Sequence, residues 1–264
     1  MDRQLSPSSD FIPASRETTN HSLEVARGNV SGVSSVHKFG ANPSVAASST
    51  EYVTFSGVIN WLTAATAVRI KAGGDAADDT AGNGARKVIV QGLDENWADA
   101  SEEITTAGSS ASTATTVTFI RVFRAYVTDV GVYTAANTGN IVIENGAGGT
   151  DLLTIEAGEG QSETSEYTVP AGKTAYLTNF DATVDAAKAA DMKMYQRRNA
   201  DDATVPFTGK RLVGGFLQLI GEATEQFGSY PSFPAKTDLW WEATTGSGTA
   251  PAVSIDYDLM LVDD

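Results

Sequence analysis

Short runs in which apolar and polar residues alternate recur along this chain, and this pattern most constrains its fold. Gly, Asn, Asp or Pro bound most of the runs, and long stretches with the apolar spacing of a helix are scarce. Alternation with a period of two predicts half-buried antiparallel strands joined by short turns. We expect strands at residues 52–61, 67–72, 86–93, 115–130, 139–146, 151–157, 165–171, 174–184, 192–198, 216–223, 238–245 and 252–262.

The number and spacing of these runs favour sandwich or jelly-roll architecture over alternating strands and helices. We predict an all-β fold with two antiparallel β-sandwich or jelly-roll-like modules behind an extended N-terminal arm. The arm is residues 1–37, the first sandwich is 38–150 and the second is 151–264. The boundary is placed near residues 146–160, in a segment rich in Gly and acidic residues. A single larger sandwich is the alternative.

The arm differs in composition from the rest of the chain. It is rich in Ser, Thr and Asn and is interrupted by Pro7 and Pro13, so we expect it to be extended in the free chain. Such an arm commonly becomes ordered on a partner, which makes Arg3, Phe11 and Arg16 candidate contact residues. A plain flexible terminus is the alternative.

The net charge of −15 and the pI of about 4.4 argue against nucleic-acid binding, which needs clustered Lys and Arg. Cysteine is absent, so disulfides, thiolate metal sites and a cysteine nucleophile are excluded. No apolar run approaches the ~20 residues that span a bilayer, and the N-terminus lacks the apolar core of a secretory signal. We therefore expect a soluble chain that is made in a cytoplasm and has no membrane partner.

Residues for catalysis are sparse, and we expect that the chain is not an enzyme. The only histidines are His21 and His37, both in the arm, and no G-x-S-x-G motif is present. An acidic stretch offers two interpretations, paired catalytic carboxylates or a solvated strand face, and local density alone favours the second. Its members are Asp94, Glu95, Asp99, Glu102 and Glu103.

A glycine-rich loop at residues 73–84 contains Asp75, Asp78 and Asp79. Their oxygens suit Ca²⁺, but the spacing is not that of an EF-hand. We expect an ordinary acidic loop and no cofactor, with Ca²⁺ binding as the alternative.

One basic concentration interrupts the acidic body. Lys193, Arg197 and Arg198 lie in a predicted strand, and Lys210 and Arg211 follow. A basic strand on an acidic subunit is a candidate contact with an acidic neighbour, including another copy of this chain. A solvated strand face is the alternative.

Aromatic residues near the C-terminus form the second candidate surface. Trp240 and Trp241 are adjacent, so they point to opposite faces of their strand, and Tyr230 and Phe233 lie shortly before them. An exposed Trp241 beside Tyr230 would suit an interface anchor or a sugar platform. Packing in the core is the alternative.

Four segments carry a resemblance to a known class of proteins. They are VHKFGANPSV (36–45), GNGARKVIVQGLDENWADASEEITTAG (82–108), TFIRVFRAYV (118–127) and EYTVPAGKTAYLTNF (166–180). Over most of residues 36–180 the chain resembles accessory virion proteins of tailed, often marine, bacteriophages. The resemblance implies a β-rich, non-enzymatic component of the virus particle, such as a capsid decoration protein or a head-fibre or tail component.

Taken together, these features predict a virion structural protein, most of all a capsid decoration or cement protein that stabilises the shell. Its expected partners are the major capsid protein and other copies of itself, as a homotrimer, on the particle surface. The alternative is a head-fibre or tail component that binds a host-surface glycan or receptor.

Overall fold

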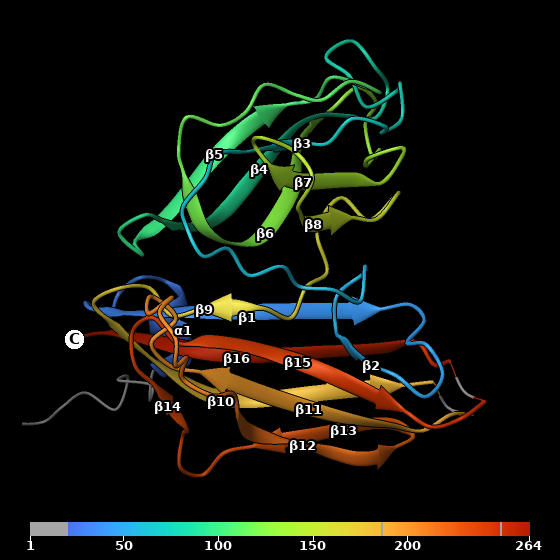
Figure 1. Ribbon diagram of the computed structural model, residues 1–264. Helices are drawn as coiled ribbons and strands as arrows, with labels where there is room; N and C mark the ends of the chain where they lie inside the picture. The colour runs from blue at the N-terminus through green and yellow to red at the C-terminus, as the bar shows by residue number, and fades with distance from the viewer. Residues whose placement is uncertain (1–20, 186, 249) are drawn as a thin grey trace, which may run out of the picture.

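The computed structural model describes residues 21–185, 187–248 and 250–264. Within these ranges the chain is all-β and its strands pair antiparallel, as predicted (Figure 1). One short helix, α1 (His21–Ala26), precedes the first strand. The described part of the chain contains no helix with the length and hydropathy that a membrane crossing needs.

Two five-stranded sheets form what we call the large body. The first sheet has the order β1 (Val33–Asn42), β16 (Val253–Asp263), β10 (Lys173–Val184), β13 (Gly221–Gln226), and β14 (Ser232–Phe233) also pairs with β10. The second has the order β12 (Arg211–Leu219), β11 (Ala190–Arg197), β15 (Asp238–Thr245), β2 (Thr50–Tyr52), and β9 (Tyr167–Thr168) also pairs with β15. Strands β12 and β13 therefore follow one another in the chain, but each lies at the edge of a different sheet.

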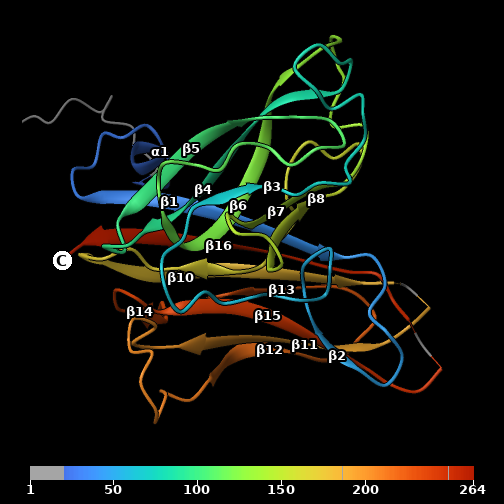
Figure 2. The ribbon, with the colours of Figure 1, turned by 45° about the horizontal axis from the view of Figure 1, so that its top comes forward.

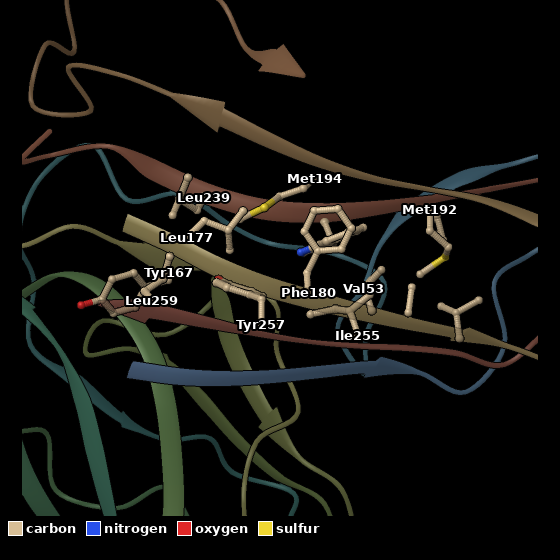
Figure 3. Packing of buried hydrophobic residues seen from close by; sticks show 14 of the residues in the cluster. Val53, Tyr167, Leu177, Phe180, Met192, Met194, Leu239, Ile255, Tyr257 and Leu259 are labelled. Carbon is tan, nitrogen blue, oxygen red and sulfur yellow. The ribbon is translucent and has the colours of Figure 1, made fainter. Parts of the chain in front are cut away.

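The core of the large body lies between these two sheets. Figure 3 shows Leu177 and Phe180 of β10 close to Met192 and Met194 of β11. The rings of Phe180 and Trp241 meet edge to face, with centroids 4.9 Å apart. Strand β16 buries every second residue from position 253 to 261, so the alternation seen in the sequence is confirmed there.

Two three-stranded sheets form the small body. One has the order β3 (Val68–Ile70), β7 (Ile141–Asn145), β8 (Asp151–Ile155), and the other has the order β5 (Asp99–Thr105), β4 (Ala85–Asp94), β6 (Phe119–Val130). A second apolar core, with residues from Val68 to Ile155, belongs to this body. Figure 1 and Figure 2 show that the small body lies on the side of β1, away from β12.

The chain divides differently from the predicted modules 38–150 and 151–264. Strands β1 and β2 precede the small body but pair with β16 and β15, in registers that place Lys38 opposite Tyr257 and Tyr52 opposite Glu242. Val45 and Val53 also contribute to the core of the large body. The small body is thus an insertion between β2 and β9, and the strands form four small sheets rather than two successive sandwiches.

The boundary predicted for the arm also differs from the structure. Residues 21–26 are helical, and β1 begins at Val33, so the segment up to residue 37 is not wholly extended. The reason is long-range pairing: β1 forms the edge of a sheet by bonding to β16.

Candidate partner-binding surface

Strand β12 is apolar on both of its faces. Val213, Phe216 and Leu219 pack against the core of the large body, and Phe216 lies opposite the buried Met192. Leu212 and Leu217 point the other way and are 58% and 69% exposed. Leu212 is paired with Tyr195 of β11, and Tyr195 stacks on Trp240, which points away from the core. This exposed side is therefore the outer face of the second sheet.

Exposed apolar side chains are concentrated along the chain in this strand and directly beside it, and we call the group the apolar edge patch. Of the ten large hydrophobic residues that are exposed in the described chain, five lie between positions 205 and 220. A concentration of this kind marks a contact surface more often than scattered single residues do. The patch consists of Val205, Phe207, Leu212, Leu217 and Ile220.

The predicted basic strand lies beside the patch. Arg197 of β11 stacks on Phe207, with the guanidinium 5.4 Å from the ring centroid. Lys193 pairs with Asp191 at 3.2 Å, and Arg198 donates to Gln196 at 3.3 Å. The predicted strand is present as β11, which ends at Arg197, and the side chains of Lys193 and Arg198 bind close neighbours in the chain.

Two further basic residues stand at the start of β12. Lys210 donates to the carboxylate of Glu242 at 2.8 Å and lies 4.3 Å from the ring centroid of Tyr195. Arg211 is exposed. The patch thus has a basic end, and Arg211 is available there for a contact outside the body.

The proposed aromatic surface is not formed as predicted. The two tryptophans do face opposite ways, but both are buried: Trp241 is in the core, and Trp240 is covered by Trp61 and stacked on Tyr195. The prediction that Trp241 contacts a partner is therefore wrong. Trp61 lies far away in the sequence, and no local pattern indicated that it covers Trp240.

Tyr230 keeps its predicted exposure, at 53%. It lines a hollow of about 370 Å³ together with His37, Asn179 and Asp258. The ring of His37 lies 2.8 Å from the Asp258 carboxylate. The other predicted contact residues, Arg3, Phe11 and Arg16, lie outside the described residues.

The acidic stretch on β4 and β5 serves local structure. Asp94 accepts hydrogen bonds from the backbone N–H groups of Asn96 and Ala98 in the turn. Glu102 accepts from the backbone N–H of Val117 at 2.7 Å, and Glu103 pairs with Lys87 at 2.7 Å. These contacts fit the solvated strand face rather than a pair of carboxylates held across a cleft.

The aspartates of the glycine-rich loop are likewise engaged. Asp78 is buried, and its carboxylate accepts from the backbone N–H groups of Ala85, Thr138 and Gly139. Asp75 accepts from the backbone N–H of Ala77 at 2.8 Å. Among the described residues no three His, Cys, Asp or Glu side chains form a group that would hold a metal ion.

A buried ion pair that the sequence did not indicate joins the two bodies. Arg121 of β6 donates two hydrogen bonds to Asp238 of β15, at 2.9 and 3.0 Å. The Arg121 guanidinium also lies between two rings, 5.2 Å from the centroid of Trp61 and 4.9 Å from that of Trp97. Such a buried pair fixes the geometry of the junction and is a structural feature rather than a binding site.

Comparison with known proteins adds little to this geometry. No protein-family model matches the chain, and no curated protein matches it. Similar solved structures include an isomalto-dextranase of Arthrobacter globiformis T6 complexed with panose. The sequence identity is 13% and the TM-score is 0.21, and the match covers 87% of this chain and 35% of that chain. The VP2 subviral particle of infectious bursal disease virus shows 7% identity, 88% and 76% coverage and a TM-score of 0.19.

The chain spans about a third of the length of the dextranase. At these TM-scores neither likeness supports an argument about fold family or activity.

Proposed function

We propose that this chain is a structural protein of a tailed-bacteriophage particle, acting by binding and not by catalysis. Its most favoured role is capsid decoration: it is made in the host cytoplasm and sits on the outer surface of the shell. Its partners are the major capsid protein and copies of itself, as a trimer, with no part for nucleic acid or membrane. The paired five-stranded sheets would serve as a sandwich-type body, and the arm would hold the shell.

The observation that carries the proposal is the apolar edge patch beside basic residues on a strongly acidic chain. The side chain of Leu217 in β12 is 69% exposed. Leaving apolar surface in contact with water is unfavourable, and a binding surface explains why it is present. The resemblance of residues 36–180 to accessory virion proteins agrees with this. The carboxylates that sequence singled out for chemistry bind backbone and lysine groups instead.

Capsids assembled with and without the protein test this role. Bound subunits that bridge capsomers should raise the temperature at which shells disrupt, because binding stabilises the state that is bound. The measurement is thermal disruption followed by light scattering at increasing protein concentration. An unchanged disruption temperature at saturation would contradict the cement role.

A second candidate is a head-fibre or tail component that binds a host glycan. The exposed Tyr230 beside the polar hollow with Asn179 and Asp258 favours it, since glycan sites combine an aromatic face with polar groups. Binding on a glycan array that is lost in Tyr230→Ala would support this role. Trp241 takes no part, because it is buried.

A further inference from the structure

The outer face of β12 has no covering element in the described chain, although the strand is apolar on both sides. An antiparallel strand with one solvated face normally has polar residues on that face. The inner side is covered, since Phe216 packs against Phe180 with ring centroids 5.4 Å apart. On the outer side Leu212 and Leu217 are exposed to solvent, and Ile220, directly after the strand, is exposed as well. A partner that covers this side would complete the burial.

The shape of the edge indicates how a partner would bind. The pairing of β11 with β12 shifts register twice, between Ala190 and Met192 and between Met194 and Tyr195. Gln218 also has a positive φ of 52°. Bulged, irregular edges resist the addition of a further strand. The contact is therefore made by side chains and not by backbone pairing.

The charge around the patch favours another copy of this chain. Residues 205–226 contain Lys210 and Arg211 against Glu222 and Glu225, a balance of zero, whereas the whole chain carries −15. Two copies repel each other over most of their acidic surface. A contact through this neutral, apolar segment adds no net charge repulsion of its own.

An acidic groove lies on the other side of the large body, over the outer face of the first sheet. Its volume is about 510 Å³, and its lining includes Gly221 and Glu222, directly after Ile220, with Glu156, Glu163 and Asp185. Burial raises the pKa of Glu163, and the charges of Glu159 and Glu156 add to this effect. A cationic side chain in the groove would relieve the crowding of negative charge.

We infer that the apolar edge patch is a contact between copies of this chain, and that Arg211 of one copy enters the acidic groove of the next. The apolar side chains supply burial, and the pairing of Arg211 with a groove on the other side of the next copy makes the contact head-to-tail. Repetition of a head-to-tail contact closes a ring when the rotation allows it. This inference rests on the proposed binding role and names one partner for it.

Analytical ultracentrifugation of the full isolated chain tests the contact. Wild type should self-associate, and Leu217→Glu should weaken the association by ~100-fold, because it buries a charge in an apolar contact. The matched control is Val132→Glu, which changes a residue that is 50% exposed on the small body and should leave association unchanged. Circular dichroism checks that both variants remain folded.

A charge exchange tests the direction of the contact. Arg211→Glu should weaken association by at least ~10-fold, and adding Glu222→Arg should restore it. A wild type that stays monomeric up to ~100 µM, or association that Leu217→Glu leaves intact, would overturn the inference. A monomer that still stabilises capsids would refute this contact alone, whereas a self-associating chain that does not bind capsids would refute the capsid role alone.

Discussion

Lys38 and Glu166 are charged residues that lie fully inside the molecule, close to the junction of the two bodies. Lys38 donates a hydrogen bond to the carbonyl oxygen of Phe123 at 2.5 Å, and Glu166 accepts one from the hydroxyl of Thr164. Burial lowers the pKa of Lys38 to about 8 and raises the pKa of Glu166 to about 7, while the attraction between the two charges opposes both shifts. The pair therefore makes stability depend on pH.

For Glu166 the sign of that dependence follows from the raised pKa. Between pH 4.5, which is the ordinary pKa of this carboxyl, and about pH 7, the folded state binds the proton more tightly than the unfolded state. Its contribution to the free energy of unfolding is therefore present below pH 4.5 and is lost as pH rises to about 7. We expect the stability of wild type relative to Glu166→Gln to fall across this window in urea titrations. A difference that is constant with pH would contradict this assignment.

Individual residues also show what the sequence could predict. Alternation correctly placed Trp240 and Trp241 on opposite faces of β15, because side chains in a strand alternate by geometry. It did not predict that both are buried, since Trp61 covers Trp240 from a segment about 180 positions away. Local pattern gives the face of a residue, but what lies against that face depends on tertiary contacts.

At the scale of elements, β12 and β13 show a limit of the same kind. The run 216–223 predicts one strand, but the structure has two, β12 ending at Leu219 and β13 beginning at Gly221. Gly221 has a φ of 77°, which lets the chain turn from the edge of one sheet to the edge of the other. The apolar composition was visible in the sequence, whereas the change of sheet was not.

Two adjacent glycines in β12 give a prediction for this element. Gly215 has a φ of 153°, and a Cβ there would overlap the carbonyl oxygen of Met192, whereas a Cβ at Gly214 would lie 3.4 Å from the Phe180 ring. We expect Gly215→Ala to lower the free energy of unfolding by ~1–3 kcal/mol. Gly214→Ala is the control and should change it by less than ~0.5 kcal/mol. Equal effects of the two substitutions in thermal unfolding would contradict the strain at Gly215.

At the scale of the whole molecule, the insertion of the small body could not be predicted. The alternation in 252–262 correctly predicted β16 as a strand, but its partner β1 lies more than 200 positions earlier. Loop composition placed the boundary near residue 150, since Gly and acidic residues are common at linkers. These residues do form the turn between β7 and β8 and the connection from β8 of the small body to β9 of the large body, but their composition did not show that the chain returns there to a body already begun by β1 and β2.

The ion pair between Arg121 and Asp238 holds the two bodies together, which gives a prediction at this scale. Arg121→Met leaves the Asp238 carboxylate buried without its partner, and should lower the free energy of unfolding by ~3–5 kcal/mol. The matched control, Lys87→Met, breaks a pair in which both side chains are 43% exposed, and should cost less than ~1 kcal/mol. Denaturant titration measures both. A loss at Arg121 no larger than that at Lys87 would show that the pair does not hold the junction.

Cryo-electron microscopy of the intact particle would show whether this chain is a binding subunit on the surface of a virus particle. We expect density for the two bodies over junctions between capsomers, with β12 facing a neighbouring copy. Density confined to the tail or to a projecting fibre, or absence of the chain from the particle, would contradict it.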